Sequence, residues 1–362
     1  MLLVLSFFRI DDLAAQNSSS SFEQVATEAD AARDANEVPL AIELYTRALQ
    51  LNAKWEDGWW SLGILQYGSG AYEAAVEALS HLLTLHPDVG QALALRGLCE
   101  FETGDYTHSL ADIEKGLALG TADDADHQQI LRYHEAMLLT RLGRFGEALR
   151  VYSAFAERKL GGPELLEAIG LAGLRIPLLP KEASRDQQSL LASAGEATYK
   201  FMEGDQKAAQ RAFKNLFERF PTARNAHYHY GTLLLAFGPE AAAPQFKKEL
   251  EVAPDNTDAL ISFAWSLLMQ SRADEALPYA RRIAQELPER SASQLVVGRA
   301  LLETGNIAAG IEHLQRGIKL EPDNLELHIA LAKAYSKSGR DEEAHRERAL
   351  CLQKTRNGAT HP

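Results

Sequence analysis

Cysteine is scarce in this chain of 362 residues, which contains only Cys99 and Cys351. Two cysteines so far apart in the sequence cannot build a disulfide framework or a cysteine metal site. Glycine and proline, at 25 and 13 residues, are too few for a low-complexity chain, and a hydrophobic content of 46% is too high for a disordered one. These absences leave a globular or repeat protein of ordinary composition.

Positive charge is also in short supply. Lysine and arginine number 37 against 50 aspartates and glutamates, which gives a formal net charge of -13. An acidic chain is poorly matched to a phosphate backbone, so we expect no nucleic-acid partner.

Long apolar runs are missing, and the sequence predicts no transmembrane span. Residues 1–8 read MLLVLSFF, far short of the roughly 18 residues that cross a bilayer, but they resemble the apolar region of a secretory signal. A sequence similar to a cleavage site follows at 13–15. Against a signal, no basic residue precedes the run, and residues 11–12 are both aspartate. We expect a signal-like segment over 1–21 and a periplasmic or secreted protein, with a cytoplasmic protein as the alternative.

Motifs of catalysis and cofactor binding are absent as well. The chain has no G-x-x-x-x-G-K-[ST] loop, no dinucleotide fingerprint and no H-E-x-x-H. His227 and His229 form the most suggestive cluster, but residues two apart on a helix point in nearly opposite directions and cannot chelate one ion. We expect one of them to be packed and the other exposed or in a groove. The sequence therefore predicts no catalytic residue, no metal site and no cofactor.

What the chain does have is a period of 34 residues. Leu260, Gln294 and His328 occupy the same place in three successive units. Within a unit, apolar or small residues recur at i, i+3, i+4 and i+7, the stripe of an amphipathic helix. A glycine or serine such as Gly70 then interrupts the helix, and the second helix often ends at a proline such as Pro87, which has no amide hydrogen. The period predicts tandem pairs of helices.

These units resemble the tetratricopeptide repeat. The likeness is clearest in Trp59-x-x-Leu62-Gly63 with Ala75 and Pro87, and in Ala209-x-x-x-Phe213 with Pro221. It covers residues 22 to 355 and implies an all-α fold, a right-handed α-solenoid of tandem helix-turn-helix repeats. Full units are expected to start near Phe22, Glu56, Gly90, Gln129, Leu190, Arg224, Thr257, Ser291 and Leu325.

The pattern departs from the family between two blocks of repeats. A partial unit begins near Pro163, but Pro177 and Pro180 stop the chain where its second helix should be, and Ser184-x-x-Gln187 resembles a capping box that begins the next helix. We predict five regions: a signal-like segment (1–21), a first block of four repeats (22–162), a partial repeat and junction (163–189), a second block of five repeats (190–355) and a tail (356–362).

The resemblance also implies where a partner binds. In the family, first-helix residues off the packing stripe line a concave face that holds peptides. By position alone, the corresponding residues are Trp60, Tyr67, Phe101, Tyr133, Arg141, Arg175, Phe201, Tyr228, Trp265, Arg299 and Lys333. Aromatic residues and arginine are enriched at binding hot spots. The alternative for each residue is that it packs only against the neighbouring first helix.

Charge separates the two blocks. Residues 22–162 hold 22 acidic and 11 basic residues, whereas residues 190–355 hold 22 and 21. The first block therefore favours a basic partner, unless its acidity serves only solubility. We predict a non-catalytic scaffold that binds a protein or peptide segment in the concave groove, in envelope assembly or secretion. The alternative is a cytosolic co-chaperone or an accessory subunit of a larger complex, and an enzyme is a distant third.

Overall fold

The computed structural model describes residues 21–120 and 125–358, and every regular element in these ranges is helical, which confirms the all-α prediction. The contacts divide the chain into two compact units, Met1–Tyr152 and Ser153–Pro362. The predicted signal-like segment lies outside the described residues, except for Ser21, which accepts a hydrogen bond from the amide of Gln24 and caps the first helix. In the described ranges, no helix combines the length and apolarity that crossing a bilayer requires.

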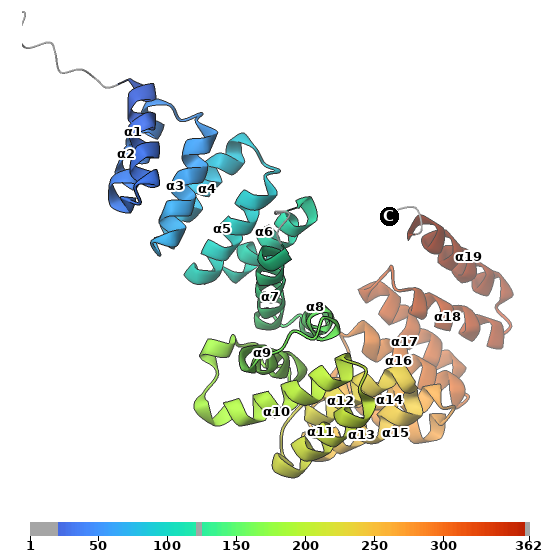
Figure 1. The fold of residues 1–362 in the computed structure, drawn as a ribbon. Coiled ribbons are helices and arrows are strands. Elements are labelled where there is room, and N and C mark those ends of the chain that lie inside the picture. Colours follow the sequence, from blue (N-terminus) through green and yellow to red (C-terminus); the bar gives the residue numbers. More distant parts are fainter. Residues whose placement is uncertain (1–20, 121–124, 359–362) are drawn as a thin grey trace, which may run out of the picture. The chain divides into compact units, whose positions relative to one another are not determined.

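The helices of the first unit follow the predicted pairs, and successive helices over residues 22–141 lie side by side (Figure 1). They are α1 (Phe22–Asp34), α2 (Val38–Leu51), α3 (Glu56–Gly68), α4 (Tyr72–Leu85), α5 (Gly90–Thr103), α6 (Tyr106–Leu119), α7 (Ala125–Arg141) and α8 (Phe145–Glu157), which runs past the boundary between the units.

The second unit begins with a single helix and continues as pairs. Its α-helices are α9 (Pro163–Gly173), α10 (Arg185–Met202), α11 (Gln206–Arg219), α12 (Ala226–Leu234), α13 (Pro239–Val252), α14 (Thr257–Met269), α15 (Ala273–Glu286), α16 (Ser291–Glu303), α17 (Ile307–Leu320), α18 (Leu325–Lys337) and α19 (Asp341–Gly358). Two 3-10 turns, η2 (Pro180–Glu182) and η3 (Leu235–Phe237), lie between them.

The turn inside each pair depends on a left-handed residue. Gly104 ends α5 with φ of 86°, and the amide of Asp105 then bonds to the carbonyl of Glu100. This conformation costs a glycine little because it has no Cβ. Ser271 adopts the same region with φ of 58°, so the period tolerates serine at this position. The predicted interruptions are therefore the turns between first and second helices.

Small residues let the two helices of a pair approach closely. A Cβ added to Gly63 would lie 2.8 Å from the side chain of Leu79, and one added to Gly298 would lie 2.7 Å from Leu314. The large partner then fills the space beside the small residue: Phe213, four residues after Ala209, is completely buried. Close packing of this kind holds each repeat together.

The helix pattern between the blocks departs from the repeat, as predicted. Among the described residues, no α-helix lies between Gly173 and Arg185, and the side chain of Gln187 accepts a hydrogen bond from the Ser184 amide as a capping box does. Leu174 and Leu179 in this segment are 1% exposed. The segment thus contributes to the core of the second unit, and the division into two repeat blocks stays a prediction.

One sequence expectation about the histidines is wrong. Both His227 and His229 are buried, because neighbouring helices cover both of the α12 faces on which these two residues lie. The ring of His227 stacks on Phe217 at 3.8 Å between centroids, and Nε2 of His229 lies 2.8 Å from the hydroxyl of Thr198. Burial lowers the pKa of His229 to about 4, so the ring is neutral at physiological pH.

Candidate protein-binding grooves

An apolar hollow lies across three first helices of the first unit; we name it the first groove. Its volume is about 320 Å³. The exposed side chains of Ile64 and Ile130, 42% and 49% accessible, lie in it beside Trp60. The helices α3, α5 and α7 supply its lining, which consists of Trp60, Ile64, Gln91, Ala94, Leu95, Leu98, His127, Ile130 and Leu131.

A second hollow, the second groove, lies across the last three first helices of the second unit. Its volume is about 350 Å³. The helices α14, α16 and α18 supply its lining, which consists of Trp265, Met269, Leu295, Arg299, Leu302, Glu303, Glu326, Ile329, Ala330, Lys333 and Lys337. Both grooves therefore occupy the first-helix face on which the sequence predicted partner binding, and their size is that of ordinary ligand-binding clefts.

Arg299 and Trp265 contact each other in the lining of the second groove. The guanidinium of Arg299 lies 4.6 Å from the centre of the Trp265 ring and makes a 3.2 Å ion pair with Glu303. A cation above an indole face is attracted by the negative charge of the ring surface. These contacts fix the orientation of Trp265 and leave the apolar side chains of Met269 and Ile329, 51% and 59% exposed, beside it.

The two adjacent tryptophans of α3 have different surroundings, although both are half-buried. Trp59 stacks on His81 at 4.4 Å between centroids, and its indole nitrogen donates to the carbonyl of Ala53. It packs against the clusters of buried residues on both sides of its repeat. Trp60 packs against one of these clusters and lines the first groove.

Of the eleven residues predicted for the concave face, four line the two grooves: Trp60, Trp265, Arg299 and Lys333. Phe201 lines a separate hollow of about 170 Å³ with Phe237. The other predicted residues lie within contacts between helices. That these eleven residues bind a partner stays a prediction.

Those remaining residues are held mainly by rings and charges of neighbouring helices. Phe101 is only 5% exposed, with its ring against Tyr106 and His134. The ring of Tyr67 contacts that of Tyr72, and the ring of Tyr133 contacts that of Tyr152. Arg141 lies over the ring of Tyr106.

Arg175 and Tyr228 belong to an ionic cluster of the second unit. Arg175 pairs with Asp258 at 2.8 Å and lies 5.3 Å from the centre of the Tyr228 ring. Arg290 pairs with the second oxygen of Asp258 at 2.9 Å. The carboxylate thus joins two arginines, and the cluster links the chain after α9 to α14 and the start of α16.

Several groove residues were missed by the sequence prediction. Leu95 and Ile130 in the first groove, and Leu295 and Ile329 in the second, are aliphatic residues on first helices. From sequence alone they are indistinguishable from the packing stripe, since both kinds of position are apolar. A signal exists only in the spacing: Ile329 and Lys333 are four apart and share one helix face.

Within the described ranges, no three His, Cys, Asp or Glu side chains come together in a way that would hold a metal ion. Among the described residues, the pKa of the Glu100 carboxyl is raised to about 7 by burial and by the charge of Asp112. It lies beside the Arg96–Asp112 ion pair and lines neither groove.

Family models of the tetratricopeptide repeat match residues 27–87, 61–125, 238–291 and 301–347, which together are more than half of the chain. The chain belongs to the tetratricopeptide repeat family. The matched segments include α3 and α5 of the first groove and α14 and α18 of the second. This family serves in general as a scaffold for protein interactions.

Two characterised proteins are similar in sequence. The TPR repeat-containing protein MJ1428 of Methanocaldococcus jannaschii is 24% identical over 90% of this chain and 54% of its own length. The protein CTR9 homolog of Arabidopsis thaliana is 34% identical over 28% of this chain and 9% of its own. The chain thus spans little more than half of one relative and a small part of the other.

Two solved structures are similar to parts of this chain at low sequence identity. MamA (41-end) from Desulfovibrio magneticus RS-1 is 19% identical, with a TM-score of 0.42, over 46% of this chain and 96% of that one. YrrB, described as a TPR protein with an unusual peptide-binding site, is 16% identical, with a TM-score of 0.39, over 45% of this chain and 84% of that one.

Proposed function

We propose that this protein is a non-catalytic scaffold that binds an extended segment of a partner protein on the first-helix face of its repeats. One observation carries the proposal: Trp60 and Ile64 of α3, Leu98 of α5 and Ile130 of α7 come from first helices of three different repeats and line one apolar hollow, in which both isoleucines are exposed. Contiguous exposed apolar surface is uncommon in soluble proteins unless it binds something. A tryptophan at the edge of such a hollow is a typical hot-spot residue.

Charge supports a basic partner for the first unit. The excess of acidic residues over residues 22–162 would attract a basic segment and hasten its encounter, whereas the apolar groove would hold it. Binding by such a partner should weaken as salt rises, because the attraction acts through solvent. A partner whose affinity is independent of salt would show that the acidity serves only solubility.

A peptide-display selection against the full chain tests the scaffold function. Among the selected peptides, we expect a class that binds in the first groove, which both Trp60 and Ile64 line. The affinity of these peptides should fall at least tenfold with Ile64→Asp. Their binding free energy should weaken by about 2 kcal/mol with Trp60→Ala. Leu119→Asp is the matched control: Leu119 ends α6, a second helix, and is 46% exposed, close to the 42% of Ile64. Equal losses from Ile64→Asp and Leu119→Asp would contradict the proposal.

An exported protein that acts in envelope assembly or secretion is the second part of the proposal. It depends on the resemblance of residues 1–21 to a secretory signal. N-terminal sequencing of the protein purified from its cells is the test: a chain that begins after residue 15 supports export, and one that keeps residues 1–15 favours the cytosolic co-chaperone or accessory subunit.

A further inference from the structure

The second groove differs from the first in its charges. Of the described residues that line the first groove, only His127 is ionisable, whereas the second groove contains Arg299, Lys333 and Lys337 together with Glu303 and Glu326. Two first-helix surfaces of one chain therefore present different chemistry to a partner.

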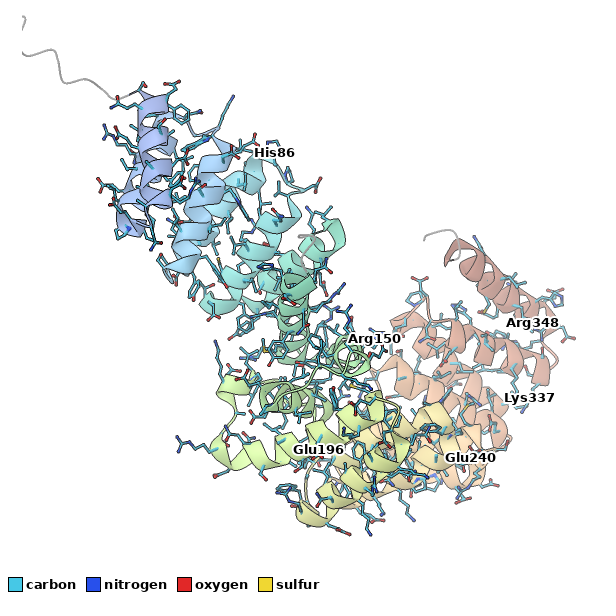
Figure 2. All side chains as sticks on the ribbon, viewed as in Figure 1. His86, Arg150, Glu196, Glu240, Lys337 and Arg348 are labelled. Atoms are coloured by element: carbon cyan, nitrogen blue, oxygen red, sulfur yellow. The ribbon has the colours of Figure 1, made fainter. Side chains whose placement is uncertain are left out.

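The two lysines are the available charges of the second groove. Arg299 forms an ion pair with Glu303, so these two opposite charges neutralise each other, and its guanidinium also lies over the ring of Trp265. Lys333 and Lys337 are both exposed, lie one turn apart on α18 and make no ion pair in the described part of the chain. Lys337 is in the last turn of α18 and is labelled in Figure 2. Two neighbouring ammonium groups with no carboxylate partner attract an anionic ligand.

The other carboxylate of the groove, that of Glu326, makes the two ends of the groove differ in charge. Glu326 is in the first turn of α18, and Lys337 is in the last, roughly 16 Å further along the helix axis at 1.5 Å per residue. Ile329 lies between these ends and, with Trp265 and Met269, forms the apolar part of the surface. A bound segment would place negative charge at the Lys333–Lys337 end and away from Glu326.

We propose that the second groove binds an acidic protein segment that carries a large apolar side chain. The apolar side chain packs against Trp265, Met269 and Ile329, and the carboxylates of the segment pair with Lys333 and Lys337. The inference rests on the proposed scaffold function and adds the chemistry of the partner at this groove. Charge pairs at the exposed rim supply selectivity and fast association, while the apolar contact supplies most of the affinity.

The test is fluorescence anisotropy with the full chain and three labelled synthetic peptides of equal length. The first carries one Phe followed by four Glu, the second has Lys in place of each Glu, and the third has Ser in place of Phe. We expect the first peptide to bind at least tenfold more tightly than either of the others. Its affinity should fall between 50 and 500 mM NaCl on the order of tenfold, since exposed charge pairs are screened.

Two charge reversals separate the groove from the rest of the surface. Lys333→Glu combined with Lys337→Glu should weaken binding of the acidic peptide at least tenfold. Lys319→Glu should change it less than twofold, because Lys319 is an exposed lysine near the end of α17, a second helix outside the groove lining. Equal binding by the parent chain and the double variant, or tighter binding of the Lys peptide, would overturn the inference.

The outcome also distinguishes this inference from the scaffold function itself. If the Lys peptide binds and Trp265→Ala abolishes its binding, the groove is a binding surface and only the proposed charge of its partner is wrong. If none of the three peptides binds, the inference for this groove is wrong, and selection at the first groove remains the separate test of the scaffold function.

Discussion

Single residues in this protein show how burial sets charge. Glu100 is 8% exposed on α5, and its carboxyl lies 3.8 Å from Nε of Arg96. That guanidinium is already committed to Asp112, with contacts of 2.6 and 3.0 Å. Burial and the charge of Asp112 together raise the pKa of Glu100 to about 7, because neither water nor Arg96 fully stabilises the ionised form.

This pKa predicts a pH dependence of stability in the first unit. The folded protein binds the proton of Glu100 more tightly than the unfolded chain, so the contribution of this group is full below about 4.5 and is lost as the pH rises through about 7. Glu100→Gln should therefore raise the free energy of unfolding at pH 8 by about 1–3 kcal/mol and have little effect at pH 4. Urea unfolding at both pH values measures it.

The control for Glu100 is Glu77→Gln, which removes an exposed carboxylate from the neighbouring helix α4. We expect its effect to be small and the same at both pH values. A Glu100→Gln variant that is destabilised at pH 8 relative to the parent chain would mean that the ionised carboxylate stabilises the fold, and it would contradict the raised pKa.

Trp59 and Trp60 provide a second test at the residue scale. Trp59→Ala removes a ring that stacks on His81 and bonds to Ala53, and it should cost about 3 kcal/mol of stability. Trp60→Ala should cost about 1 kcal/mol, because one side of this ring faces the first groove. Thermal melts of both variants measure the difference. Equal losses would place Trp60 in the core and remove it from the groove.

At the scale of helices, the contact between α9 and α10 is the departure from the repeat. The two helices cross where Gly170 faces the backbone carbonyl of Leu191 and Gly195 faces that of Leu166. A Cβ at either glycine would overlap a backbone oxygen, so the contact requires glycine on both helices. Two first helices thus pack directly where a second helix is missing.

Gly195→Ala tests this contact. In an ordinary helix the change would stabilise by up to about 1 kcal/mol. Here the added methyl collides with the backbone near Leu166, and we expect a net loss of about 1–3 kcal/mol in denaturant unfolding. Gly146→Ala in α8, where an added Cβ meets nothing within 4 Å, should be neutral or stabilising. If both variants behave alike, the α9–α10 contact is looser than described.

How far the sequence predicts these elements depends on how local their signals are. The starts of α3, α5, α14 and α16 follow from the period, because each repeat has its own apolar stripe and a glycine or serine at its turn, and three of the four end at a proline. The α9–α10 contact could not be predicted, since nothing local distinguishes a contact glycine from a turn glycine. Likewise, Phe101 was placed in the groove by position, whereas Tyr106 and His134 cover its ring.

At the scale of the whole molecule, the protein has two apolar grooves on its first helices, and we propose that both bind partners. The first groove is nearly uncharged within an acidic set of repeats, and the second holds two lysines without carboxylate partners in the described part of the chain. Both surfaces arise from the same geometry, in which residues off the packing stripe of three successive first helices meet. Their different side chains imply different partners.

The most direct test of this central claim is site-specific photocrosslinking in the cells that make the protein. A photoreactive residue replaces Ile64 or Ile329 in the grooves, or Leu119 or Leu320 on the second helices α6 and α17, all of them at least 40% exposed. We predict that the two groove positions crosslink to other polypeptides, with different partners for each groove, and that the second-helix positions give few products. Crosslinks of equal yield and identity from all four positions would contradict the claim.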